Sequence, residues 1–188
     1  KTSEETQEIW DRDAVLYDMV YVIRQFQPDV IVCRFPPTSQ GGHGHHTASA
    51  ELGIEAFNMV NDPNVYPEQL KTVDLWQPLR IVVNTGRWWN EDISADDEGV
   101  VAHDIGSYDA LLGESNNERS MHSRSQHKSQ GFGATGYRGE YVEYFEHLDG
   151  KMAENSLFDG IDDTWERFEA KGDEKKKRDA ASDAIDAM

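Results

Sequence analysis

The chain has 188 residues, enough for one domain with a sizeable core, and its five Trp, seven Tyr and seven Phe argue against disorder. Its formal net charge of −18 disfavours nucleic acid and anionic membrane surfaces as partners. No apolar run approaches the ~20 residues of a membrane helix, so we expect no membrane insertion. Cys33 is the single cysteine, which excludes an intrachain disulfide and a cysteine-based zinc cluster.

The first third of the chain predicts a helix, a strand, a loop and a second helix. Apolar residues recur at helical spacing over residues 4–27, and Pro28 ends this helix. Residues 29–35 predict a buried strand with Cys33 in its core-facing run, residues 38–46 a polar Gly-rich loop, and residues 47–60 the second helix. This order predicts a layered α/β domain with a mainly parallel sheet, in which ligands bind at the carboxyl ends of strands.

The remainder of the domain alternates predicted strands with long loops. Residues 67–77 form a connector, 79–85 a buried strand, 86–98 a long loop and 100–105 a third strand. A polar helix is expected over 114–128, a Gly-rich loop over 131–139 and an edge strand over 140–148. We therefore assign residues 1–150 to one domain and residues 151–188 to a polar C-terminal extension or a linker to a further domain.

The predicted loop after the first strand carries three histidines, His43, His45 and His46. Imidazole is the commonest protein ligand of zinc and related metals. His43 and His46 are three residues apart at the entry of a helix and can point the same way. They fit a catalytic metal site, which has three protein ligands and one position for water. The alternative is an exposed turn that binds metal adventitiously.

The stretch of residues 28–50, PDVIVCRFPPTSQGGHGHHTASA, resembles the second motif of the LmbE/PIG-L deacetylase family, in which a buried strand leads to His-x-x-His. Asp104-Ile105 resembles the family's Asp-Val/Ile-Ser strand end, and His127-Lys128-Ser129-Gln130 resembles its His-x-Ser-Gln element. These resemblances cover residues 2–150 in the family's order. They imply a Rossmann-like layered fold.

The resemblance implies a zinc-dependent hydrolase, with another divalent metal possible, that removes N-acetyl or other N-acyl groups from amino sugars or glycoconjugates. His46 matches the family's metal ligand, and His43 matches its catalytic His, which acts as an electrostatic or acid group. The family's opening His-Pro-Asp-Asp-Glu motif is absent, and His45 replaces the usual Asp between the two histidines. We therefore expect the first strand to be missing, a partner segment to supply it, and this stretch alone to be inactive.

Further residues carry weaker expectations. Arg34 is a candidate to bind substrate, or else forms a structural salt bridge. Trp88 and its neighbour Trp89 are candidates to stack on a sugar ring or to pack internally. His127 and Gln130 are candidates to support the site. We expect His103 in the core, His122 and His147 at the surface, and a solvated acidic turn at residues 96–98.

Two other functional interpretations stay open at this point. One is a carbohydrate-binding or scaffold module that keeps the fold without catalysis, and the other is a metal-binding protein without hydrolytic activity. The compartment is open as well, with a periplasmic or secreted location preferred.

Overall fold

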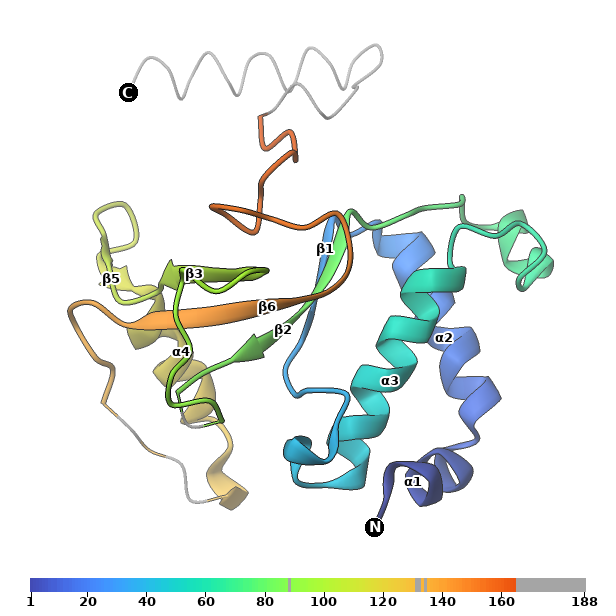
Figure 1. Ribbon diagram of the computed structural model, residues 1–188, viewed down its shortest axis with the longest axis horizontal. Coiled ribbons are helices and arrows are strands. Elements are labelled where there is room, and N and C mark those ends of the chain that lie inside the picture. The colour runs from blue at the N-terminus through green and yellow to red at the C-terminus, as the bar shows by residue number, and fades with distance from the viewer. Residues whose placement is uncertain (88, 131–132, 134, 165–188) are drawn as a thin grey trace.

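The computed structural model describes residues 1–87, 89–130, 133 and 135–164 (Figure 1). The fold is mixed α/β, with a four-stranded sheet and helices gathered mainly at the side of its first strand. The elements in chain order are α1 (Ser3–Trp10), α2 (Arg12–Phe26), β1 (Val30–Cys33), α3 (Gly44–Met59), β2 (Arg80–Thr85), β3 (Val100–Asp104), β4 (Tyr108–Asp109), β5 (Glu114–Ser115), α4 (Asn116–Arg124) and β6 (Val142–Gly150).

The single helix predicted over residues 4–27 is wrong, because the chain turns at Asp11. This residue has a left-handed backbone with φ of 59°, and its side chain accepts the N–H of Ala14 to cap α2. The preceding helix α1 has its own capping box, in which Thr2 and Glu5 satisfy each other's backbone N–H groups. Asp11 therefore ends one helix and begins the next although the apolar spacing continues through it.

The sheet has the strand order β1-β2-β6-β3. β1 and β2 are parallel, whereas β6 is antiparallel to both of its neighbours, β2 and β3. The strand predicted over residues 140–148 exists, but the prediction that it lies at an edge is wrong, since β6 is inside the sheet. The sheet is therefore mixed, with β1 at an edge, and the prediction of a mainly parallel sheet is wrong, because β6 returns antiparallel between β2 and β3.

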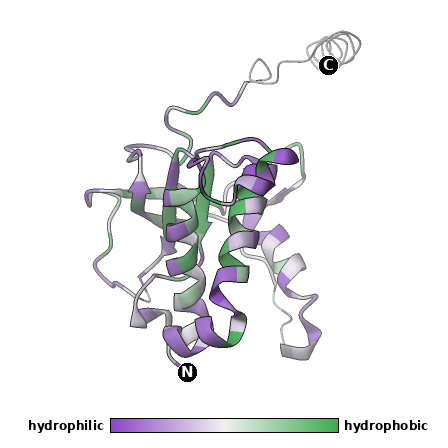
Figure 2. Cartoon of the chain, turned by 90° about the vertical axis from the view of Figure 1, so that its right-hand side faces the viewer, coloured by the Kyte–Doolittle hydropathy of each residue, from purple (hydrophilic) through white to green (hydrophobic). Residues whose placement is uncertain are grey.

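The core lies between α3 and the sheet. Ala50 and Phe57 of α3 pack with Ile81 and Val83 of β2 and with Cys33, which is buried as predicted. A second cluster joins α2 to α3 through Leu16, Val20, Ala56 and Val60. Hydrophobic residues are accordingly concentrated on the central strands and on parts of the helices in front of them, while the N-terminal end is mostly hydrophilic (Figure 2).

Residues 151–164 are held against the domain by a buried arginine. The guanidinium of Arg80 donates hydrogen bonds to the backbone carbonyls of Lys151, Leu157 and Asp159. Within the described ranges, no helix combines the length and the apolar character needed to cross a membrane.

Candidate metal and substrate site

The three histidines lie at the edge of the sheet where the parallel strands end. Cys33 at the end of β1 pairs with Val83 of β2, so the carboxyl ends of both strands reach the same side. The chain then passes through a 3-10 turn at Ser39–Gly41 and enters α3 at Gly44, three residues earlier than predicted. Open α/β sheets bind ligands at this side, which makes the loop a candidate site on position alone.

Short-range contacts fix the shape of this loop. The hydroxyl of Thr47 donates to the carbonyl of Thr38 at 3.0 Å and so ties the start of α3 to the start of the loop. At Gly44 the N-terminal segment passes so closely that a Cβ atom would stand 2.1 Å from the carbonyl oxygen of Thr2. Only glycine fits there, because 2.1 Å is far inside van der Waals contact.

His46 is held on two sides. Its ring stacks on Phe35, with 3.7 Å between the centroids and 4° between the planes, and its Nδ1 lies 2.9 Å from the carbonyl oxygen of Gly41. A carbonyl only accepts, so Nδ1 carries the proton in this hydrogen bond. In the neutral ring the lone pair is then on Nε2. A backbone carbonyl bonded to one ring nitrogen is the usual support of a histidine that binds metal through the other.

His43 occupies the N-cap position of α3 without capping it, since its side chain makes no cap hydrogen bond. Ser, Thr, Asp and Asn are the favoured residues at an N-cap position. A histidine at this position is therefore not explained by helix stability. The ring centroid of His43 lies 5.4 Å from that of His46, and His45 lies 4.2 Å from His46. The pKa of His45 is lowered by loss of hydration and, next, by the neighbouring rings of His46 and His43.

The spacing of the His43 and His46 rings can be compared with that of two ligands of one zinc ion. Zn–N bonds of about 2.0–2.1 Å place the centroids of two ligand rings on the order of 5 Å apart, close to the spacing of this pair. A catalytic zinc site needs a third protein ligand. Among the residues that the structure describes, no group of three or more His, Cys, Asp or Glu side chains is arranged to hold a metal ion. The two rings also border different hollows, His46 the groove beside β1 and His43 a hollow against the N-terminus.

A polar chain of side chains runs along the same edge of the sheet. Arg34 donates to the Oδ1 atom of Asn84 at 2.6 Å, and the Nδ2 atom of Asn84 donates to Glu143 at 2.8 Å. Asn84 is 8% exposed and joins the end of β1 to the start of β6. Asn84 was not predicted from the sequence, although an amide directly after the apolar run Ile81–Val83 was a usable signal.

The predicted tryptophan loop comes close to the histidines. Trp89 contacts Phe35 edge to face, with 5.9 Å between the centroids, on the ring that carries His46. Trp88, the candidate named from the sequence, lies outside the described residues, as does the side chain of Gln130. His127 is exposed between α4 and a 3-10 turn, and within the described residues no hydrogen bond, ion pair or ring contact joins it to the His43–His46 loop.

For the other histidines, some of the predicted positions are confirmed and others are wrong. His122 is exposed as predicted. The placement of His103 in the core is wrong: it lies on the exposed side of β3. His147, expected at the surface, is half-buried, and its Nδ1 atom has no hydrogen-bond partner among the described residues. Residues 96–98 form an exposed acidic turn, as the sequence predicted.

Compared with known proteins, the chain matches no family model, no curated protein and no solved structure. The LmbE/PIG-L resemblance thus stays a hypothesis from the sequence, next to a described site with one supported imidazole, that of His46, and a polar sheet edge.

Proposed function

We propose that the protein is a metal-dependent hydrolase that removes N-acetyl or other N-acyl groups from amino-sugar or glycoconjugate substrates. The observation that supports this most directly is the state of His46, whose Nδ1 is bonded to the carbonyl of Gly41 while the ring lies on Phe35. That arrangement prepares Nε2 for a metal before any metal arrives. The order of the sequence motifs is the second support.

In this proposal His46 and His43 have separate tasks. His46 ligates zinc or another divalent metal through Nε2. His43, whose side chain is exposed and 5.4 Å from His46 between centroids, stabilises the developing oxyanion or protonates the leaving amine. A metal bound here would lower the pKa of its water and polarise the substrate carbonyl. The remaining ligands and the general base would be carboxylates from outside the described residues.

Arg34 and Asn84 would hold the substrate side of the site. Their hydrogen bond fixes a guanidinium at the carboxyl end of β1, where a substrate hydroxyl or carboxylate is within its chemistry. Arg34 is thus proposed as a substrate-binding residue and Asn84 as the residue that positions it.

A second candidate function is carbohydrate binding without catalysis. It is favoured by a polar hollow of about 470 Å³ at the same edge, lined by Arg87, Glu140, Tyr141, Glu143 and Tyr144 among others. Carboxylates accept hydrogen bonds from sugar hydroxyls, and tyrosine rings pack on sugar faces. Binding of N-acetylglucosamine without release of acetate would select this function.

The test is an assay of free amine released from N-acetylglucosamine and from N-acetylglucosaminyl glycoconjugates, on the protein as it is encoded, with any flanking sequence. We expect activity in the presence of zinc, and its loss in the His43→Ala variant while zinc content is retained. Equal, metal-independent inactivity of the parent and the variant toward every such substrate would overturn the proposal.

A further inference from the structure

Strand β1 leaves one of its two backbone edges open. It pairs with β2 from Val30 to Cys33, and the described strands place no other partner beside it. Each backbone N–H and C=O group that faces away from β2 is therefore available for another chain. An open edge of this kind is a template for strand addition, because extended backbone satisfies it group by group.

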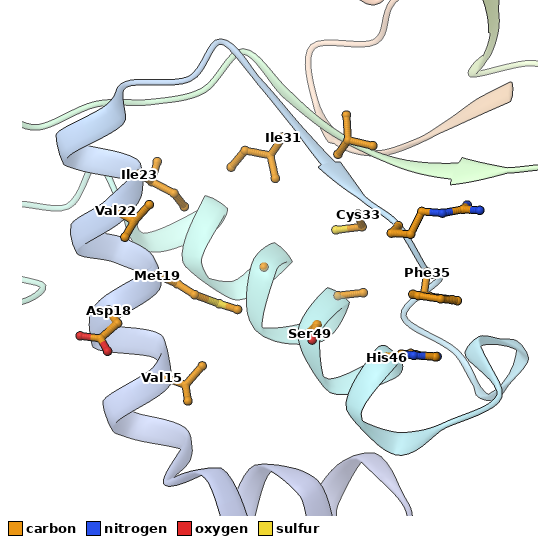
Figure 3. Close-up of a pocket in the computed structure, with 14 residues that line it drawn as sticks. Val15, Asp18, Met19, Val22, Ile23, Ile31, Cys33, Phe35, His46 and Ser49 are labelled. Carbon is orange, nitrogen blue, oxygen red and sulfur yellow. The ribbon is translucent and has the colours of Figure 1, made fainter. Parts of the chain in front are cut away.

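An apolar groove of about 630 Å³ runs along this open edge (Figure 3). Its walls are formed by α2, which contributes Asp18, Met19 and Val22, by α3, and by residues 31–35 with His46. Val22 is 57% exposed and Val32 48% exposed, although both are large apolar side chains. An exposed apolar surface bounded by an open strand edge is typical of a binding surface for protein.

We propose that this edge and groove bind an extended polypeptide segment, which pairs with β1 as a fifth strand and fills the space between α2 and α3. The open backbone edge of β1 favours an extended strand over other occupants of the groove. A helix or an acyl chain would cover the groove but would leave the N–H and C=O groups on the open edge of β1 without hydrogen-bond partners and shielded from water. Each buried polar group left without a partner costs about 1–3 kcal/mol.

The length and pattern of the segment follow from β1. Because β1 has four residues, the added strand needs about four to six to cover it. Side chains alternate between the faces of a sheet, and Ile31 and Cys33 contact the core cluster of α3. The segment would therefore present an apolar, β-branched residue to the groove at every second position, with polar residues between them.

Charge argues against a second copy of this chain as the occupant. Two copies would each bring a net charge of −18, and the groove itself carries Asp18. A segment with flanking lysines would be attracted by the same charges. The inference depends on the groove and the strand edge alone, so it stands or falls separately from the proposed hydrolase.

The experiment uses an octapeptide probe in which valine and threonine alternate between terminal lysines. Its binding is measured by fluorescence anisotropy, and hydrogen exchange of the full chain is followed with and without it. We expect saturable binding below about 1 mM peptide and slower exchange of amides within residues 30–33. A control peptide has the same side chains but is N-methylated on one backbone edge, so it keeps the apolar surface and cannot form the backbone hydrogen bonds to β1. It should bind at least about tenfold more weakly.

Two variants of α2 form a matched pair. Val22→Asp places a charge in the groove, whereas Phe26→Asp places the same charge on a more exposed residue, 79% exposed, that does not line it. We expect at least a tenfold loss of affinity in Val22→Asp and little change in Phe26→Asp, with unchanged circular dichroism in both.

Several outcomes would overturn the inference. One is the absence of probe binding or of protection in residues 30–33. Another is equal affinity for the two peptides, or displacement of both by dodecanoate, which would assign the groove to acyl chains. A third is self-association of the protein, measured by ultracentrifugation, that Val22→Asp abolishes, which would assign it to a second copy.

Discussion

The imidazole of His46 lies flat on the ring of Phe35, with centroids 3.7 Å apart and planes 4° apart. Together with the hydrogen bond from Nδ1 to Gly41, this contact leaves the ring no alternative orientation that keeps both partners. A ligand that is already oriented loses little entropy when it binds metal. The proposed metal site would therefore depend on Phe35, which orients His46 but is not itself a ligand.

Replacing Phe35 with alanine should lower zinc affinity by about tenfold or more, because residues that orient a metal ligand contribute on this scale. The measurement is calorimetric titration with zinc. Phe26→Ala removes another phenylalanine, 79% exposed, and should leave the affinity unchanged. Similar affinities in both variants would mean that the stack does not orient the ligand.

Two glycines of α3 should respond in opposite directions to alanine. Gly44→Ala drives a methyl group into the carbonyl of Thr2, and we expect a loss of about 1–3 kcal/mol of unfolding free energy. At Gly53 the nearest atom to an added Cβ is the sulfur of Cys33 at 3.6 Å, which is ordinary contact. Gly53→Ala should therefore add about 0.5–1 kcal/mol, as is typical within a helix. Urea unfolding measures both changes, and a shared sign would contradict this account of the loop.

The strands β1, β2 and β3 were predictable because each contains a short run of β-branched apolar residues. The position of β6 was not, since Glu143, Glu146 and Asp149 give it the polar character of an edge strand. Its place between β2 and β3 is decided by pairing over long sequence distances. A pattern along the chain carries no information on which strands become neighbours.

In the site, the histidines were visible in the sequence but their supports were not. Gly41 supports His46 with a carbonyl group, which every residue has, and Phe35 does so with a ring that equally suits a core. The break at Asp11 was hidden for a related reason, because a single capping side chain interrupted a continuous apolar spacing. Side-chain chemistry can be predicted from the sequence, whereas backbone contacts require the fold.

The buried thiol of Cys33 should make stability fall at alkaline pH. Burial raises its pKa from 9.0 to about 11, so between these values the folded chain keeps a proton that the unfolded chain loses. The contribution is complete below about pH 9 and disappears as the pH rises toward 11. Urea unfolding at pH 8 and pH 10 should show a larger loss for the parent than for Cys33→Val. Equal losses, or rapid alkylation of the folded chain at pH 8, would count against a buried thiol.

Asp159 should hold residues 154–156 at neutral pH and release them in acid. Its carboxylate accepts the backbone N–H groups of Asn155, Glu154 and Ser156, and these hydrogen bonds lower its pKa. The stabilisation is therefore present above the usual aspartate range and is lost as the pH falls through the lowered pKa. Asp159→Asn should speed proteolysis within residues 151–164 at pH 7. Asp92→Asn, at an exposed carboxylate elsewhere, is the control, and an equal rate in both variants would refute the assignment.

The central proposal is that His46 ligates a divalent ion and that His43 acts beside it without holding the metal. Its most direct measurement is zinc titration of the parent chain and of three single alanine variants at residues 43, 45 and 46. We predict that zinc affinity falls about tenfold or more in His46→Ala and stays within about twofold of the parent in His43→Ala and in His45→Ala. An affinity that is unchanged in His46→Ala, or that falls equally in all three variants, would contradict the claim.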